Sequence, residues 1–124
     1  MKKKLFIIPV LFFVLVMVLF RCVIYIGYVP SGSMEPTIPA GSKVIGIRII
    51  PELEKGDIIV FGYGDTYMIK RIAASPGEKV GGGIVPEDCY YVLGDNSANS
   101  YDSRYWENPF VHRSRIKAII ICKV

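Results

Sequence analysis

"DIIVFGYGDTYMIKRIAA", residues 57–74, is the stretch that decides which fold this sequence predicts. Two runs rich in β-branched and aromatic residues, 57–63 and 66–74, flank a glycine-containing turn segment at 62–65. Runs of this composition that are bounded by turn residues are typical of β-strands. The stretch therefore predicts two strands of a sheet rather than a helix.

Three more strand-like runs lie elsewhere in the chain, at 43–50, 89–94 and 116–124. Turn segments that contain glycine or proline separate the runs, and they lie at 39–41, 54–57, 75–78 and 81–83. Turns this frequent predict a compact antiparallel sheet or barrel, so the expected fold class is mainly β. The roughly 100 residues that follow the N-terminal segment are enough for a small core.

The N-terminal segment is of a different kind. Three lysines at 2–4 precede the run 5–20, which contains no charged residue, and apolar residues continue beyond Arg21. As a helix, residues 5–25 would span about 31 Å, which is enough to cross a hydrocarbon core of about 30 Å. The sequence therefore predicts one N-terminal transmembrane helix joined to a compact antiparallel β domain.

A cleavable signal peptide has the same lysine-then-apolar pattern. No small-x-small cleavage site follows the run, however, and a cut at the nearest candidate, 29–31, would remove Ser31. We therefore expect an uncleaved, single-pass anchor in the cell membrane. The predicted division is a cytoplasmic basic tail at 1–4, a transmembrane anchor at 5–25 and an extracytoplasmic β-rich domain at 26–124, with the lysines holding the N-terminus inside.

The net charge and the small number of suitably spaced metal-binding side chains exclude several functions. The net charge is +4, but three of the positive charges belong to the N-terminal lysines, and the other twelve basic residues nearly balance eleven acidic ones. This balance predicts no basic face for nucleic acid. One histidine, scattered carboxylates and no close cysteine pair give no ligand spacing for a metal, so no metal and no cofactor are expected. Cys89 and Cys122 either form a disulfide or stay as buried thiols.

"VPSGSMEPT", residues 29–37, follows the predicted anchor and contains Ser31 and Ser33. Serines between prolines are usual turn residues. A nucleophilic serine also has to lie on an exposed, sharply bent segment of backbone. The stretch by itself leaves both interpretations open.

Lys70 differs from the other lysines because it lies inside an apolar strand-like run. Strand alternation places Met68, Lys70 and Ile72 on one face of that strand. Burial there would lower the pKa of the lysine, as a general base near neutral pH requires. The alternative is an exposed lysine that protects a sheet edge from pairing.

Two other polar features bear on the chemistry. His112 could belong to a serine–histidine–aspartate triad, but no carboxylate lies close to it in the sequence, and a surface histidine is the expected role. The polar loop 94–104 follows a strand-like run and is bordered by aromatic residues. Asp102 and Arg104 in this loop could form a bidentate pair that fixes it.

These stretches occur together in one order. The chain resembles the bacterial type I signal peptidases, which are membrane-anchored serine proteases with a serine–lysine dyad. The matching segments follow the N-terminal anchor and are "PSGSMEPT" 30–37, "KGDIIVF" 55–61, "YMIKRI" 67–72, "PGE" 76–78 and "GDNSANSYDSRYW" 94–106. The resemblance implies a largely antiparallel β fold.

The resemblance also implies roles for individual residues. Ser33 would be the nucleophile and Lys70 its general base. Ser31 and the backbone N–H of Ser33 would bind the oxyanion, Ser100 would hydrogen-bond to Lys70 and orient it, and Met34 would contact substrate. Four further residues would support the site without reacting: Arg71, Asp95, Asp102 and Arg104.

The implied function is the removal of signal peptides from exported preproteins at the lipid bilayer. Only 22 residues, 72–93, separate the lysine segment from the polar loop, and Ser97 stands where many members have arginine. These departures bear on the substrate groove and its specificity.

Three other functions are alternatives to the general removal of signal peptides. One is a peptidase dedicated to a single substrate, such as a conjugative pilin, which the small size favours. A second is a self-cleaving repressor, which the anchor and the lack of a DNA-binding segment argue against. The third is an inactive anchored binding module, and the joint presence of Ser31, Ser33, Lys70 and Ser100 argues against it.

Overall fold

The two strands predicted at 57–63 and 66–74 form the central hairpin of the sheet. In the computed structural model, which describes residues 2–81 and 83–124, β3 (Ile58–Tyr63) and β4 (Thr66–Ala74) pair antiparallel. Ile58 lies opposite Arg71, and Tyr63 lies opposite Thr66 at the turn. Alternate residues of β4 are buried from Lys70 onward, as expected for a strand with one face on the core.

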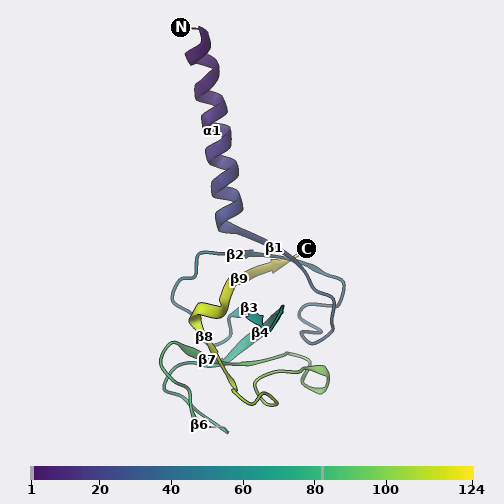
Figure 1. Cartoon of the computed structure of the whole chain (residues 1–124). Helices are drawn as coiled ribbons and strands as arrows, with labels where there is room; N and C mark the ends of the chain where they lie inside the picture. Colours follow the sequence, from purple (N-terminus) through teal and green to yellow (C-terminus); the bar gives the residue numbers. More distant parts are fainter. Residues whose placement is uncertain (1, 82) are drawn as a thin grey trace.

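The hairpin lies inside an antiparallel sheet of seven strands in the order β1-β2-β9-β3-β4-β7-β8 (Figure 1). The remaining strands of this sheet are β1 (Ile24–Tyr28), β2 (Lys43–Ile47), β7 (Cys89–Leu93), β8 (Phe110–His112) and β9 (Ile116–Lys123). A second, two-stranded sheet and two short 3-10 helices complete the regular structure of the described residues: β5 (Lys79–Val80), β6 (Gly83–Ile84), η1 (Ser97–Asn99) and η2 (Arg113–Arg115). The predicted mainly β fold with one N-terminal helix is confirmed.

Two strands of the large sheet were not predicted. β1 is apolar and continues the N-terminal run, so the sequence gives no sign of a change from helix to strand. It is a strand because it pairs with β2 over its whole length, from Ile24 opposite Ile47 to Tyr28 opposite Lys43. β8 has only three residues and was too short to recognise.

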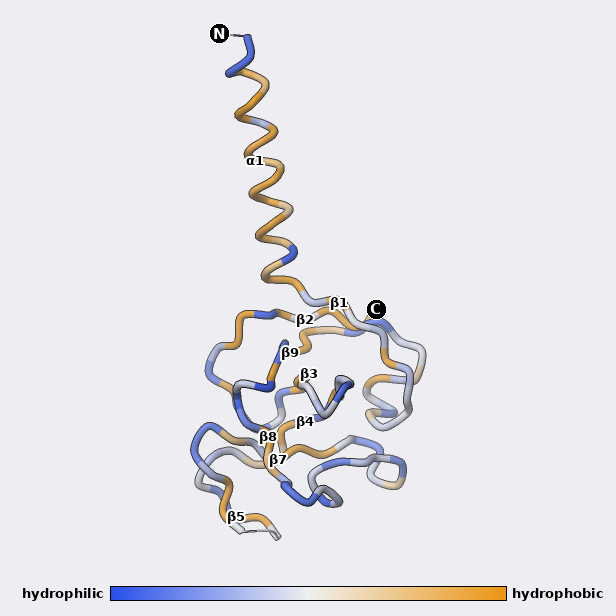
Figure 2. Tube along the Cα trace, viewed as in Figure 1, coloured by the Kyte–Doolittle hydropathy of each residue, from blue (hydrophilic) through white to orange (hydrophobic). Residues whose placement is uncertain are grey.

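The N-terminal helix, α1 (Lys2–Val23), projects away from the sheet, and none of its described residues is buried against it (Figure 1). Figure 2 colours most of the helix as hydrophobic between the lysines at its tip and its base. At about 1.5 Å per residue its 22 residues extend about 33 Å. By length and composition α1 can cross a membrane. It ends two residues before the predicted limit of the anchor because Ile24 already pairs with β2.

Two apolar clusters form the core of the β domain. The larger one lies beneath the central strands and comprises Leu53, Ile59, Phe61, Ile72, Tyr90, Val92, Trp106, Val111 and Ile116. The smaller one, which we call the turn cluster, comprises Val29, Met34, Ile38 and Val44. The turn cluster fixes residues 29–38, the segment that carries both candidate serines.

The Phe61→Ala variant tests the larger cluster. Phe61 is fully buried, and its ring packs edge-on against Trp106 with 5.9 Å between centroids. We expect the free energy of unfolding to fall by about 3–5 kcal/mol, because the substitution leaves a cavity. Urea unfolding of the full chain in detergent micelles, followed by circular dichroism, measures this change. Ile84→Ala, at an exposed position, is the control and is expected to stay within about 0.5 kcal/mol of the parent. Equal losses in the two variants would contradict the assigned core.

Candidate active site

Ser33 and Lys70 meet at the centre of the site. The turn cluster positions Ser33, and β4 positions Lys70 on its buried face. The Nζ atom of Lys70 donates a hydrogen bond to Oγ of Ser33 at 2.8 Å. Both side chains are almost removed from solvent, since the exposed fractions are 8% for Ser33 and 5% for Lys70. Lys70 is therefore not an exposed lysine at a sheet edge.

Burial changes the acid–base properties of Lys70. Removal from water disfavours the ammonium form and lowers the pKa of Lys70 below its ordinary value of 10.5. The negative charge of Asp102 acts in the opposite direction, but its effect is the smaller of the two. A larger fraction of Lys70 is therefore neutral near pH 8 than for a lysine in water.

Ser31 and the backbone of Ser33 provide hydrogen-bond donors beside Oγ of Ser33. The Oγ atom of Ser31 lies 3.5 Å from Oγ of Ser33 and donates to it. In the part of the chain that the structure describes, the backbone N–H of Ser33 has no acceptor. Two donors next to one serine oxygen are the arrangement that an oxyanion hole requires.

The polar loop 94–104 clamps the turn that carries Ser33. The backbone N–H of Asn96 donates to the carbonyl of Ser33 at 2.9 Å, and Nδ2 of Asn96 donates to the carbonyl of Gly32 at 3.0 Å. These two bonds hold the peptide group that contains the Ser33 amide and the peptide group that follows it. Sequence reasoning missed Asn96, and only its place in the matching loop could have drawn attention to it.

Gly94 permits this close approach. A Cβ atom at this position would collide with the side chain of Ser100 and would lie 2.6 Å from the carbonyl oxygen of Ser33. Only glycine fits between the polar loop and the turn that carries Ser33 without a shift of one of them.

Asp102 organises the same loop from the inside. It is fully buried, and the guanidinium of Arg104 donates to both of its oxygens, with Nε–Oδ1 at 2.9 Å and Nη2–Oδ2 at 3.1 Å. The backbone N–H of Gly94 also donates to it, at 3.0 Å. Burial raises the pKa of Asp102, but these donors lower it further than burial raises it, so that it lies below its ordinary value. The hydrogen bond to the Asp102 carboxylate raises the pKa of Arg104. The predicted bidentate pair is therefore present.

Ser100 lies beside this pair, but it does not make the contact that the resemblance implied. Its hydroxyl donates to Oδ2 of Asp102 at 2.7 Å, and the hydrogen bonds of the described residues include none between Ser100 and Lys70. The carboxylate is the stronger acceptor for the only hydroxyl proton of Ser100. In this structure Ser100 orients Asp102 rather than Lys70.

A second ion pair joins the loop to the sheet. The Nε and Nη2 atoms of Arg71 donate to the two oxygens of Asp95 at 2.8 and 2.7 Å, and Nη1 donates to the carbonyl of Gly56. Thr37, which sequence reasoning missed, donates to the same carboxylate. The pairing lowers the pKa of Asp95 and raises that of Arg71. Asp95 and Arg71 thus connect β4, the polar loop and the turn that carries Ser33. Their side chains make no hydrogen bond to the side chain of Ser33 or Lys70 among the described residues.

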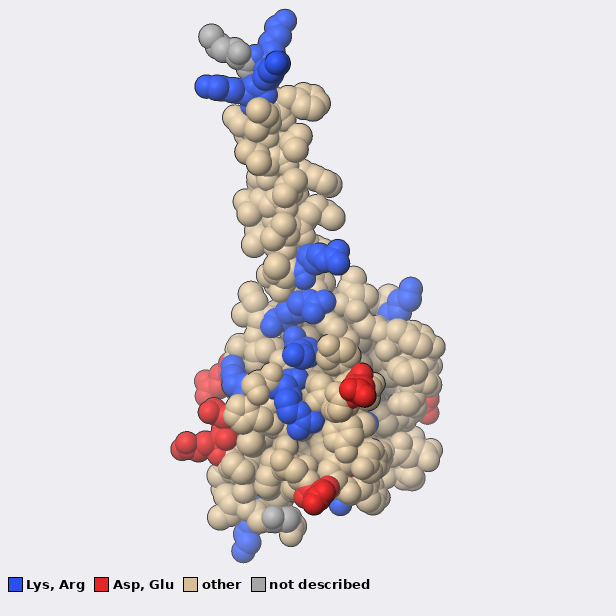
Figure 3. All heavy atoms as spheres, in the orientation of Figure 1, with Lys and Arg blue, Asp and Glu red and all other residues tan. Residues whose placement is uncertain are grey.

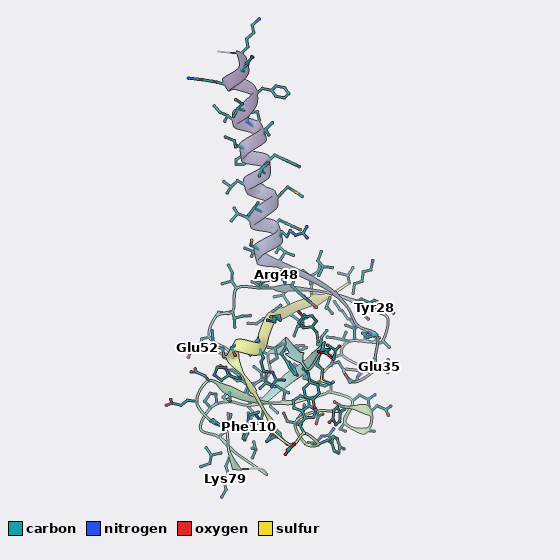
Figure 4. All side chains as sticks on the ribbon, in the orientation of Figure 1. Tyr28, Glu35, Arg48, Glu52, Lys79 and Phe110 are labelled. Atoms are coloured by element: carbon teal, nitrogen blue, oxygen red, sulfur yellow. The ribbon has the colours of Figure 1, made fainter. Side chains whose placement is uncertain are left out.

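A cleft of about 380 Å³ opens in front of Ser33 and Lys70. Its walls come from β1, the turn that carries Ser33, the first half of β4, Asn99 and Tyr101. Figure 4 labels Tyr28 and Glu35, which flank the turn on this side of the domain. Met34 contributes to the floor of the cleft, although its side chain is fully buried in the turn cluster. β7 pairs with β4 only from Arg71 onward, so the edge of residues 66–70 facing the cleft carries no strand.

The other predicted features lie outside this site. His112 is exposed, and its Nδ1 atom pairs with the hydroxyl of Ser114 at 2.8 Å. The three cysteines are free thiols, and Cys89 is half-buried whereas Cys122 is exposed. The residues that the structure describes hold no cluster of side chains suited to a metal ion.

Comparison with known proteins gives a match over nearly the whole chain. The family described as signal peptidase, peptidase S26, matches residues 2–82 and 79–123. A Synechocystis protein named "Probable signal peptidase I-2" is 35% identical over an aligned length of 127 residues. The alignment covers 72% of this chain and 57% of the relative. Signal peptidase I of Leptolyngbya laminosa is 32% identical, with 64% of this chain and 59% of the relative covered.

A Staphylococcus aureus relative, named inactive signal peptidase IA, is 25% identical and covers 84% of this chain and 83% of its own length. The chain spans less than two thirds of the length of the Synechocystis and Leptolyngbya relatives.

The match to this family model over nearly the whole chain shows that the chain belongs to the signal peptidase, peptidase S26 family. Within that class it belongs to the bacterial type I signal peptidase family, as its sequence motifs predicted.

Gly94→Ala tests the contact between the polar loop and the turn that carries Ser33. We expect the free energy of unfolding to fall by about 1–3 kcal/mol, because the added Cβ forces the loop away from Ser33. Gly62→Ala is the matched control, since a Cβ there meets no atom within 4 Å, and it is expected to change stability by less than about 0.5 kcal/mol. Thermal unfolding in micelles compares the two. A Gly94→Ala protein as stable as Gly62→Ala would contradict the close approach.

Proposed function

We propose that the chain is a membrane-anchored serine endopeptidase that removes signal peptides from exported preproteins with Ser33 as nucleophile and Lys70 as general base. One observation carries the proposal: the buried Nζ of Lys70 lies 2.8 Å from Oγ of Ser33. A serine hydroxyl needs a base to accept its proton, and a neutral lysine can serve without a histidine.

The reaction follows from this pair. Neutral Lys70 accepts the proton of Ser33 while Oγ attacks the carbonyl carbon of the scissile peptide bond. The protonated Lys70 then gives that proton to the leaving amine as the carbon–nitrogen bond breaks, which leaves an ester on Ser33. A water molecule, deprotonated by the neutral Lys70, then attacks the ester carbon. The protonated Lys70 returns this proton to Oγ of Ser33 as the ester bond breaks, and the carboxylic acid product is released. Each cycle returns Lys70 to its neutral form, which burial favours.

Ser31 and the Ser33 amide stabilise the negative charge in this scheme. The carbonyl oxygen of the substrate becomes an oxyanion during attack, and both donors lie beside the attacking Oγ. The hydrogen bonds from Asn96 to the carbonyls of Gly32 and Ser33 restrain the peptide group that contains this amide. Preorganised donors of this kind are usually the largest contribution to acyl-transfer catalysis.

Substrate binds in an extended conformation along the free edge of β4. Residues 66–70 have unpaired backbone groups on the cleft side, and a peptide that pairs with them passes Lys70. Strand addition at an open sheet edge supplies affinity through the main chain, while pockets on one face select side chains. We expect the family preference for small residues at the first and third positions before the cut.

The proposed setting is the cell membrane, with α1 (Lys2–Val23) as the anchor that the sequence predicted at 5–25. The lysines at its N-terminal end lie together at the tip of the helix (Figure 3) and favour a cytoplasmic N-terminus. The β domain then lies outside the cytoplasm, where preproteins emerge. The partners in this proposal are the signal peptides of preproteins and the lipid bilayer.

An inactive binding module is the competing function, and the inactive Staphylococcus aureus relative makes it a real alternative. The buried hydrogen bond between Lys70 and Ser33 favours an active enzyme. A peptidase dedicated to one substrate, such as a conjugative pilin, uses the same chemistry and differs only in which preproteins are cleaved.

Ser33→Ala and Lys70→Ala test the proposal. We expect each to reduce cleavage of a preprotein with an Ala-x-Ala site by at least about 10³-fold, because each removes half of a nucleophile–base pair. The measurement is cleavage by the full chain in liposomes, with circular dichroism to check folding. Lys79→Ala and His112→Ala, both exposed, are the controls and keep parental rates.

Cleavage that survives Lys70→Ala but not His112→Ala would overturn the assigned base. A folded parent that cleaves no member of a preprotein panel would favour the dedicated or inactive alternatives.

Asp102→Asn tests the electrostatics of the base. The carboxylate of Asp102 raises the pKa of Lys70, so its removal lowers that pKa further. The value of kcat/KM rises with pH as Lys70 loses its proton, and we expect the midpoint of this rise to move to lower pH in the variant. Asp65→Asn, at the exposed tip of the β3–β4 hairpin, leaves the midpoint unchanged. A midpoint that stays in place or moves to higher pH would contradict the role of Asp102.

A further inference from the structure

The two faces of β4 meet different surroundings at the cleft. In the pairing of β3 with β4, Phe61 lies opposite Met68, and Val60 lies opposite Ile69. Residues directly opposite each other in an antiparallel pair share a face, and successive residues of a strand alternate between faces. Met68 and Lys70 therefore share the face that packs on the larger cluster, whereas Ile69 packs against the turn cluster on the other face.

Tyr101 stands beside the face that carries Met68. It lines the cleft, and 53% of its surface is exposed. Its ring lies edge-on to the rings of Tyr63 and Trp106, with 6.1 and 6.2 Å between centroids. Tyr63 alternates with Phe61 along β3, so these contacts place Tyr101 on the same side of the sheet as Met68. One side of the cleft is therefore an aromatic wall.

The rings next to Tyr101 already hold cations. The guanidinium of Arg104 lies 5.1 Å from the centre of the Tyr105 ring, which stacks on Tyr101 with 14° between the planes. The guanidinium of Arg115 lies 5.9 Å from the centre of the Tyr63 ring. None of the described residues that line the cleft is acidic. The wall therefore favours an uncharged apolar or aromatic side chain over a further cation.

The opposite side of the cleft is crowded. Tyr25 packs against the turn cluster, and a Cβ atom at Gly27 would lie 2.7 Å from its side chain. The phenol of Tyr25 thus takes the space beside β1 that a side chain at position 27 would fill. Small substrate side chains fit this face better than large ones.

A substrate strand along the free edge of β4 presents its side chains alternately to these two faces. The first and third residues before the cut share one face, and the second residue faces the other. Met34 adjoins Ser33 and contributes to the cleft floor from the turn cluster, so the side chain next to the scissile bond meets that cluster. The second side chain then meets Tyr101.

We propose that Tyr101 makes the second position before the cut a selective subsite, which takes an aromatic or large apolar side chain in preference to lysine or glycine. This inference rests on the proposed function and narrows it, because a small-x-small site leaves that position open. Packing of an aromatic ring against Tyr101 is expected to raise kcat/KM about tenfold over glycine.

The test uses quenched fluorescent peptides that contain Ala-x-Ala, with phenylalanine, leucine, glycine or lysine as x, and the full chain in detergent micelles. For the parent we expect phenylalanine to be cleaved with kcat/KM about tenfold above glycine, and lysine no faster than glycine. Tyr101→Ala is expected to reduce the ratio of phenylalanine to glycine to about twofold. Tyr101→Phe keeps the parental ratio, because the ring and not the hydroxyl makes the contact.

Tyr67→Ala is the matched control. Tyr67 also lines the cleft and is 63% exposed, but it alternates with Met68 and lies on the face of Ile69. Its truncation is expected to leave the ratio of phenylalanine to glycine at the second position unchanged. A second peptide panel varies the third position, and there Tyr101→Ala keeps the parental ratio of alanine to phenylalanine. Circular dichroism checks that each variant is folded.

Each outcome decides one point. If the parent cleaves all peptides of the first panel at equal rates, or prefers lysine, the subsite is wrong and the proposed function stands; this comparison needs no variant. If the parent prefers phenylalanine but Tyr101→Ala keeps the tenfold ratio, or changes the third position instead, Tyr101 is not the selective residue. If the folded parent cleaves no peptide and no preprotein, the proposed function fails and the subsite fails with it.

Discussion

Removal of the Lys70 side chain from water is the constraint on which the arrangement of this domain depends. A buried ammonium is costly, and the structure offers it one hydroxyl at 2.8 Å and one carboxylate that is already occupied by Arg104. Because Asp102 is shared, its influence on Lys70 stays smaller than that of burial. The balance leaves a lysine that releases its proton more readily than a lysine in water, next to a serine that has a proton to give.

The surrounding contacts serve to hold this pair in place. Met34 fills the turn cluster and prevents the Ser33 turn from moving inward, while Asn96 restrains the same turn from the opposite side through two carbonyls. Arg71 and Asp95 tie the polar loop to β4, the strand that carries Lys70. Ser33, Lys70 and the polar loop are therefore held in one rigid arrangement, which is the condition for a short buried hydrogen bond to persist.

Much of this could be predicted from the sequence because the relevant patterns are local. Alternation in β4 made Lys70 a candidate for burial, although an exposed lysine at a sheet edge stayed an alternative. The turn residues around the strand-like runs indicated an antiparallel sheet or barrel. β1 could not be predicted, since its apolar residues continue the helix and only pairing with β2 distinguishes the two. The partner of Ser100 and the role of Asn96 also escaped prediction, because they depend on which acceptor lies nearest after the loop has folded.

The site is assembled from segments that are distant in the chain. The bond between Lys70 and Ser33 spans 37 positions, that between Thr37 and Asp95 spans 58, and that between Asn96 and Gly32 spans 64. Contacts of this range form only after long loops have closed, which makes them late events in folding. A chain that is still emerging, or that has lost its polar loop, therefore contains the serine and the lysine without the geometry that joins them. Under the proposed function, the reactivity of Ser33 therefore depends on completion of the fold, which by itself keeps an unfinished chain inactive.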